Sequence, residues 1–219
     1  MLPKLYYHPF SSYSQKALIA CYEHGIGFEP RLLEGPDSPA GRELAALWPL
    51  QRFPVLVDGE RVVMEATCVI DYLHLQKPPS GRLIPADPQA ALEVRLLDRV
   101  FDNYVMTPMQ KIVFDAMRPP DARDAAGVRD ARQMLDTSYA WLQQRLAGRA
   151  WAAGERFSLA DCAAAPSLFY ADWVHPIPQP LDAVRGYRQR LLQRPSFARA
   201  VDEARPYRAL FPLGAPDRD

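Results

Sequence analysis

Apolar residues follow two different periods along the first 80 residues of the chain. Short β-prone runs alternate with stretches in which apolar residues recur every three or four positions, the spacing of one helix face. The predicted strands cover residues 5–7, 28–33, 54–57 and 61–64. The predicted helices cover residues 17–22, 39–48 and 66–75. This β-α-β-α-β-β-α order favours parallel pairing across the strand-helix-strand units and one antiparallel hairpin.

Turn-forming residues mark the ends of these elements. Asp58-Gly59 separates the last two predicted strands and is typical of a tight β-hairpin. Four prolines follow the last predicted helix, which favours a linker between two domains. They are Pro78, Pro79, Pro85 and Pro88. We therefore expect an α/β domain at residues 1–77, a linker at 78–88 and a second domain at 89–219.

The second domain has an almost wholly helical pattern. Its first long apolar stripe consists of Leu92, Leu96, Val100, Tyr104 or Val105, Met109 and Ile112. Pro108 lies inside this stripe and is expected to kink or interrupt the helix, because proline has no N–H to donate. Ser158 and Asp161 have the spacing of a capping box at the start of a later helix. Further helices are predicted at 128–146, 181–193 and 195–205.

Composition then narrows the class of protein. The 219 residues contain 26 Lys plus Arg and 26 Asp plus Glu, so the net charge is zero, which argues against a nucleic-acid partner. No apolar run approaches the roughly 20 residues of a membrane-spanning helix, and the first ten residues show no secretion signal. The three cysteines do not suggest a disulfide framework and favour a reducing cytoplasm. The four histidines lack the spacing of metal ligands, so no metal is expected.

Ser11-Ser12-Tyr13-Ser14 lies between a predicted strand and a predicted helix. The start of a helix has free N–H groups and a partial positive charge, and both stabilise an anion. A serine hydroxyl at this point can also donate a hydrogen bond to a thiolate, which lowers the pKa of the thiol. The alternative is that these serines only cap the helix, which is a common role for serine.

Two further segments of the first domain have possible ligand-binding chemistry. A cis bond before Pro54 would turn the backbone of Phe53 toward a peptide-like ligand, although an ordinary trans proline also suits the start of a strand. Glu65-Ala66-Thr67 opens a helix, where N–H groups can bind a carboxylate and Glu65 can pair with an ammonium group. An acidic first-turn residue beside a threonine cap is the simpler alternative.

Taken together and in this order, these segments resemble the cytosolic glutathione transferase family. Ser11-Ser12-Tyr13-Ser14-Gln15-Lys16 is similar to the serine motif of the zeta and related classes. Phe53-Pro54-Val55-Leu56 with Asp58-Gly59 resembles the family's cis-proline strand and hairpin, and Phe157-Ser158-Leu159-Ala160-Asp161 resembles its capping box. The resemblance covers residues 3–205. It implies a thioredoxin-like N-terminal domain, an all-helical C-terminal domain, and a cytoplasmic homodimer that binds glutathione between the two domains.

The resemblance also implies roles for individual residues. Ser11 would hydrogen-bond the sulfur of glutathione, with Ser12 beside it, while Ser14, Tyr13 and Tyr7 stay open as alternatives. The rest of glutathione would be held by Arg52, Phe53, Pro54, Glu65, Ala66 and Thr67. The family usually has a serine where Ala66 stands, and Thr67 is one possible compensation. A small hydrophobic electrophile would bind beside the helix that carries Tyr104 and Met109, along with Asn103, Met106 and Phe114.

The expected activity is attack of the glutathione thiolate on that electrophile. Two alternatives stay open. The serine motif is also compatible with a glutathione-dependent cis-trans isomerase of the maleylacetoacetate type. The missing serine at position 66 is compatible with a protein-binding module of the same fold that has no transferase activity.

Overall fold

Four short strands form one mixed sheet, in the order β2-β1-β3-β4, in the computed structural model, which describes residues 2–76 and 82–219. The strands are β1 (Lys4–Tyr7), β2 (Glu29–Leu32), β3 (Val55–Asp58) and β4 (Arg61–Met64). β1 and β2 are parallel, whereas β3 pairs antiparallel with both β1 and β4. The predicted hairpin is confirmed, and its turn uses Gly59 at a φ of 60°, which glycine adopts without strain.

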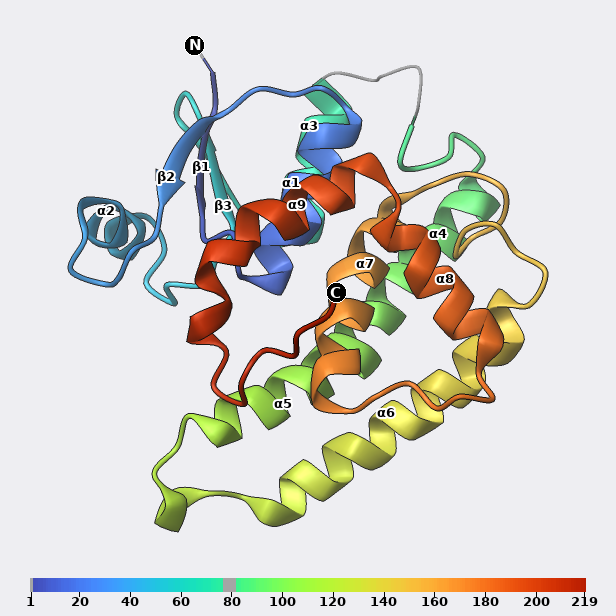
Figure 1. Ribbon diagram of the computed structural model, residues 1–219. Helices are drawn as coiled ribbons and strands as arrows, with labels where there is room; N and C mark the ends of the chain where they lie inside the picture. The colour runs from blue at the N-terminus through green and yellow to red at the C-terminus, as the bar shows by residue number, and fades with distance from the viewer. Residues whose placement is uncertain (1, 77–81) are drawn as a thin grey trace.

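Helices cover both faces of this sheet (Figure 1). They are α1 (Ser12–Glu23), α2 (Pro39–Leu47) and α3 (Ala66–Gln76). Successive side chains of a strand point to opposite faces. Leu5 and Tyr7 accordingly pack with α1 and α3, while Tyr6 packs in the cluster that contains Leu44 of α2. The N-terminal domain is therefore a three-layer α/β unit, as the sequence predicts.

The second domain is all-helical, as predicted. Its elements are α4 (Pro88–Val100), the π-helix η1 (Phe101–Met106), α5 (Thr107–Ala116), the 3₁₀-helix η2 (Pro120–Ala122), α6 (Ala125–Leu146), α7 (Leu159–Val174), α8 (Asp182–Leu192), α9 (Pro195–Ala204) and the 3₁₀-helix η3 (Arg205–Leu210). None of the helices in the described part of the chain is long and apolar enough to cross a membrane. Two described residues of the predicted linker region, Leu83 and Ile84, are buried in the hydrophobic core. Residues 78–81 of that linker lie outside the described residues.

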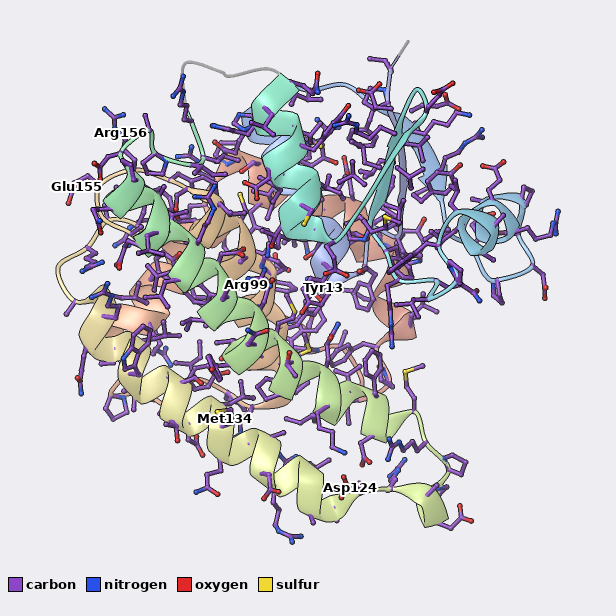
Figure 2. The ribbon with its side chains drawn as sticks, turned by 180° about the vertical axis from the view of Figure 1, so that it is seen from behind. Tyr13, Arg99, Asp124, Met134, Glu155 and Arg156 are labelled. Atoms are coloured by element: carbon purple, nitrogen blue, oxygen red, sulfur yellow. The ribbon has the colours of Figure 1, made fainter. Side chains whose placement is uncertain are left out.

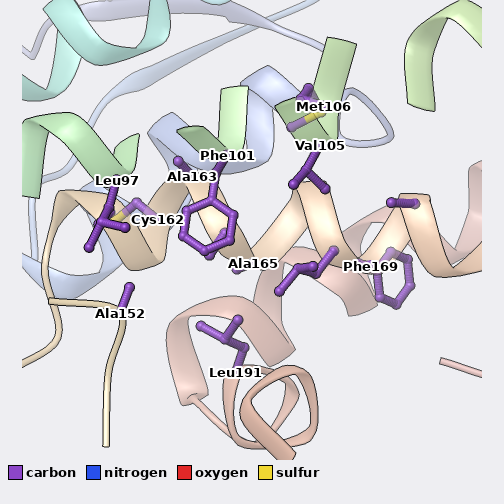
Figure 3. Packing of buried hydrophobic residues seen from close by; sticks show 14 of the residues in the cluster. Leu97, Phe101, Val105, Met106, Ala152, Cys162, Ala163, Ala165, Phe169 and Leu191 are labelled. Carbon is purple, nitrogen blue, oxygen red and sulfur yellow. The ribbon is translucent and has the colours of Figure 1, made fainter. Parts of the chain in front are cut away.

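Helix α7 lies at the centre of the helical domain, and Figure 3 shows Phe101 and Val105 of η1 packed against its small residues. All residues of α7 from Leu159 to Asp172 are buried. A helix that is apolar all round is stable only inside a core. The predicted capping box is confirmed, because both the N–H and the hydroxyl of Ser158 donate to Asp161 Oδ2 at 2.8 Å.

The apolar stripe predicted for α4 lies on the exposed face of the helix, so the prediction of its buried face was wrong. Leu92 and Leu96 are exposed, and the buried face instead carries Val94 and Leu97. Apolar residues occur on both faces of α4, so the helical spacing alone does not choose between them. The outer stripe continues to Tyr104, which is 49% exposed, while Val105 takes the buried position.

The predicted interruption at Pro108 is confirmed as a π-helical turn between α4 and α5. Proline has no N–H for the carbonyl four residues earlier, which belongs to Tyr104. That carbonyl oxygen instead accepts a hydrogen bond from Ser138 Oγ of α6 at 2.8 Å. The wide turn that results places Asp102 in the interior, where α1, α3 and α4 meet.

Candidate functional site

A cavity of about 460 Å³ lies between the two domains. Its N-terminal side, which we call the polar wall, consists of Ser11, Ser12, Tyr13, Gln51, Arg52, Phe53, Pro54, Glu65 and Ala66. Its other side, the apolar wall, consists of Phe10, Met109, Gln110, Val113, Phe114, Met117, Tyr170, Leu210, Phe211 and Pro212. The three sequence segments with candidate chemistry therefore meet at one cavity.

Ser11 is the N-cap of α1 and lines the cavity. Its Oγ accepts a hydrogen bond from the N–H of Ser14 at 3.3 Å. A hydroxyl group has one hydrogen to donate and two lone pairs, so this cap leaves the hydrogen free. The N–H groups of Ser12 and Tyr13 also have no acceptor among the described residues. Capping and anion binding are thus compatible at Ser11, rather than alternatives.

The other candidate hydroxyl groups differ in position. Ser14 is fully buried, and its Oγ accepts a hydrogen bond from the N–H of His8. Tyr7 packs edge-on against Phe28 in the N-terminal core and does not line the cavity. Tyr13 does line it, but burial, together with the nearby charge of Asp102, raises its pKa to about 12. Tyr13 is therefore a neutral phenol at pH 7 and can only donate or accept a hydrogen bond there.

Phe53 and Pro54 belong to the polar wall, and the bond between them is cis, as predicted. Strand β3 begins only at Val55. Neither the N–H nor the carbonyl of Phe53 has a hydrogen-bond partner among the described residues. The backbone of Phe53 is thus free to pair with an extended, peptide-like ligand.

Two residues of the polar wall have strained backbone conformations. Gln51 has a φ of 51° and Glu65 a φ of 67°, and they are the non-glycine residues with positive φ in the described ranges. Such conformations cost about 1–3 kcal/mol each and cluster at functional sites. The sequence analysis missed Gln51, because neither its residue type nor its neighbours signal this conformation.

Glu65 and Arg52 supply opposite charges to the polar wall. Glu65 stands directly before α3, and its carbonyl accepts the helix's first hydrogen bond, from Val69. The N–H groups of Ala66 and Thr67 have no acceptor among the described residues, so this helix start can bind a carboxylate. Arg52 is exposed at the rim and forms no ion pair with any described residue.

Thr67 does not line the cavity, and its side chain belongs to a buried charge cluster. Its Oγ1 accepts hydrogen bonds from Lys16 at 2.8 Å and from Arg99 at 2.6 Å. Lys16 is fully buried and also pairs with Asp98 at 2.6 Å and with Asp102 at 2.7 Å. All the hydrogen bonds of the Thr67 hydroxyl are therefore made within this cluster. This hydroxyl cannot replace the one that a serine at position 66 would supply.

The charge cluster joins the two domains immediately behind the polar wall. Figure 2 shows Arg99 on α4 and Tyr13 at the start of α1, on the two sides of this junction. Burial raises the pKa of Asp102, against the opposing effect of Lys16. One oxygen of Asp102, Oδ1, is buried without a hydrogen-bond partner among the described residues. The start of α3 is thus tied to η1 of the second domain through Lys16 and Thr67.

The apolar wall differs from the predicted electrophile site in one respect. Met109 and Phe114 line the cavity, but Tyr104 does not. Tyr104 lies on the outer face of η1, in line with the exposed Leu96, so its prediction as a pocket residue is not supported by its position. The apolar wall also includes Tyr170 and residues 210–212, which have no sequence motif. No group of three or more potential metal ligands occurs in the described part of the chain.

Family comparisons agree with this geometry. The model for the glutathione S-transferase N-terminal domain matches residues 5–81, and that for the glutathione S-transferase C-terminal domain matches residues 105–195. The chain belongs to the cytosolic glutathione S-transferase family.

The chain aligns over most of its length with individual members of known identity. It is 29% identical over 212 residues to glutathione S-transferase 3 of Zea mays, covering 90% of this chain and 92% of the relative. It is 28% identical over 209 residues to FtsZ-localized protein A of Caulobacter vibrioides, covering 88% of each. A glutathione-bound glutathione S-transferase structure from Methylobacillus flagellatus has a TM-score of 0.81 and 25% identity, covering 90% of this chain and 98% of that one.

Proposed function

We propose that this protein is a transferase in which the thiolate of bound glutathione attacks a small apolar electrophile. The observation that carries this proposal is the position of Ser11. Its hydroxyl hydrogen is free, it stands at the start of α1, and it lines a cavity whose opposite wall is apolar. A polar group that stabilises a thiolate thus lies across from a surface suited to an apolar molecule.

The polar wall fits the three parts of glutathione. The unpaired Arg52 would bind the glycine carboxylate, and the free backbone of Phe53 would pair with the cysteinyl residue. At the other end, Glu65 would bind the ammonium group of the γ-glutamyl residue. The free N–H groups of Ala66 and Thr67 would bind its carboxylate. In this arrangement the sulfur would lie next to Ser11.

Ser11 then has one chemical role in the reaction. It donates a hydrogen bond to the sulfur, and the partial positive charge at the start of α1 adds to the same effect. Both lower the pKa of the thiol, so that its proton passes to water and the thiolate forms at neutral pH. The thiolate sulfur forms a bond to the electrophilic carbon. In a substitution that carbon expels a leaving group with its bonding electron pair, and in an addition the displaced electron pair moves to the neighbouring atom, which takes up a proton from water.

A second candidate is partner binding without transfer. The side chain of Thr67 is committed to Lys16 and Arg99, so no hydroxyl group stands where the family has a serine. The chain is also similar to a protein whose name describes localisation with FtsZ. This candidate predicts a folded protein that binds glutathione weakly or not at all.

Calorimetric titration with glutathione, followed by a conjugation assay with an activated aryl halide, separates the two candidates. The proposal predicts saturable binding and a reaction rate that depends on the enzyme. S-methylglutathione serves as the control, because it should bind to the same wall without reacting. Binding without turnover of any aryl halide, or no binding at millimolar glutathione, would contradict the transferase.

We also propose that the protein is a homodimer in the cytoplasm. The exposed Leu92, Leu96 and Tyr104 lie at four- and eight-residue spacings along one outer face of α4 and η1. Such a continuous apolar stripe is a feature of interfaces. Sedimentation should show a dimer at micromolar concentration, and Leu96→Glu should shift it toward a monomer. A monomeric wild-type protein would contradict this part of the proposal.

A further inference from the structure

Three residues of the apolar wall come from a segment with little regular structure. Leu210 ends the 3₁₀-helix η3, and Phe211 and Pro212 follow it. Phe211 is buried between Tyr170 and Trp173, with ring centroids 6.5 and 5.2 Å away. It also lies edge-on to Phe10, the residue directly before Ser11. The segment from Arg205 to Asp219 thus closes the cavity on the side next to the proposed sulfur site.

Charged groups hold the end of this segment against its start. Asp219 accepts hydrogen bonds from Arg205 at 2.5 Å and from Arg208. Although burial opposes ionisation, these hydrogen bonds hold the pKa of Asp219 below its ordinary value, so its carboxylate is charged at neutral pH. The guanidinium group of Arg208 also lies over the ring of Trp173, 5.3 Å from its centroid.

A second set of contacts ties the segment to the helical core. Arg218 donates to Asp172 of α7 at 2.5 Å and to its backbone carbonyl at 3.0 Å. The same Asp172 carboxylate pairs with the buried Arg188 of α8 at 3.2 Å. We call the contacts of Asp219 and Arg218 the clasp. Leu210 and Phe211 stand on the chain between the two ends of the clasp.

We propose that the clasp makes residues 205–219 the specificity-determining wall of the electrophile site, by fixing how far Leu210 and Phe211 stand from Ser11. This proposal rests on the proposed transferase function. An apolar wall held close gives a small electrophile full contact and excludes a bulky one. A wall that moves away loses contact with the small electrophile and admits the larger one. No residue of the segment belongs to the polar wall, so glutathione binding is independent of the clasp.

Asp219→Asn tests the proposal, since the uncharged amide keeps the size of the side chain but weakens both arginine contacts. With a small and a bulky aryl halide of equal intrinsic reactivity, KM for the small one should rise about fivefold. KM for the bulky one should stay or fall, and KM for glutathione should not change. Hydrogen exchange of the amides of residues 205–216 should become faster. Asp219→Glu should restore the wild-type values, because it restores the carboxylate.

Arg218→Gln repeats the test at the contact between the clasp and α7, and Asp71→Asn is the control. Asp71 pairs with Arg95 at 3.7 Å on the surface, away from the segment, so its loss should change none of these quantities. Faster exchange in residues 205–216 with an unchanged ratio of the two KM values would overturn the specificity role. Unchanged exchange in both Asp219→Asn and Arg218→Gln would overturn the clasp itself.

A readout without glutathione separates this proposal from the transferase proposal. Binding to the cavity of an apolar fluorescent dye no larger than the small aryl halide should weaken about fivefold in Asp219→Asn. If the wild-type protein binds the dye but neither binds nor conjugates glutathione, the transferase proposal fails while the clasp is still tested. If dye affinity is equal in the wild-type protein and Asp219→Asn, the clasp proposal fails even in an active transferase.

Discussion

The two walls of the cavity are built in different ways. The polar wall is positioned by backbone geometry: a helix cap at Ser11, a cis bond before Pro54 and a left-handed residue at Glu65. The apolar wall is made of side chains from α5, from α7 and from residues 210–212, and Phe114 and Leu210 are 47% and 63% exposed. Backbone groups are held rigidly, whereas half-exposed side chains can adjust. For the proposed transferase, the thiol chemistry would therefore depend on the polar wall and the choice of electrophile on the apolar wall.

The largest predicted effect concerns the junction that holds the walls together. Lys16→Met would remove the buried cation of Asp98 and Asp102 and leave them paired with the half-exposed Arg99. Removing one partner of a buried ion pair destabilises a protein by about 3–5 kcal/mol. Urea denaturation should show a loss of that size in the free energy of unfolding. Arg95→Met, which removes a half-exposed pair with Asp71, should cost less than about 1 kcal/mol, and equal losses in both variants would contradict the role given to Lys16.

A smaller effect is predicted at the polar wall. Glu65→Gln removes the negative charge proposed to bind the γ-glutamyl ammonium group. A hydrogen bond to a charged group contributes about 1.5–3 kcal/mol, so glutathione affinity should fall roughly 10- to 100-fold. Calorimetry measures this change, with Glu60→Gln in the exposed hairpin turn as the matched control. KM for the electrophile should not change. If instead only that KM changed and glutathione affinity stayed the same, the assignment of glutathione binding to the polar wall would be contradicted.

At the apolar wall we predict the opposite pattern. Phe114→Ala should raise KM for an aromatic electrophile by roughly tenfold, because about 1.5 kcal/mol of apolar contact is lost. Glutathione affinity should stay at its wild-type value. Trp141→Ala is the control, since Trp141 of α6 is a similarly exposed aromatic residue that does not line the cavity. Steady-state kinetics that show the larger effect for Trp141→Ala would mean that the electrophile binds elsewhere.

The smallest effect is a gain. Ala66→Ser adds a hydroxyl group at the start of α3, where the side chain of Thr67 is already committed. One added hydrogen bond contributes about 0.5–1.5 kcal/mol, so glutathione should bind a few-fold more tightly. Calorimetry on Ala66→Ser and on the matched Ala66→Gly variant measures this difference. Weaker binding in Ala66→Ser would show that the γ-glutamyl carboxylate lies elsewhere.

The difference between the two walls also explains which parts of the structure could be predicted from the sequence. The elements of the polar wall are local, so a serine before a helix, a Phe-Pro pair and a glutamate before a helix are each visible in a few residues. The face of α4 was predicted wrongly, because Leu92 and Leu96 are as apolar as the residues that are buried. Tyr104 was expected beside the electrophile from the family resemblance, whereas the structure exposes it on the outer face of η1, away from the cavity. Residues 210–212 could not be predicted, since only tertiary packing brings them to the site.

Ion pairs between residues that are far apart in the chain are equally difficult to predict from the sequence. Lys16 belongs to the serine segment, but its partners Asp98 and Asp102 lie more than 80 residues further on. The commitment of Thr67 to this cluster follows from those distant contacts and not from its position after Ala66. Local motifs thus located the backbone of the polar wall, while the packing between domains determines which of the nearby side chains remain free.

The most direct test of the account is the pKa of the thiol of bound glutathione, measured by the ultraviolet absorbance of the thiolate against pH. In Ser11→Ala this pKa should rise by about one unit, which corresponds to about 1.36 kcal/mol and to a roughly tenfold loss of thiolate at neutral pH. Turnover should recover at high pH, and glutathione affinity should change little. Ser14→Ala and Tyr13→Phe are the controls and should leave the pKa of the thiol in place. An unchanged pKa in Ser11→Ala would contradict the role of this hydroxyl group.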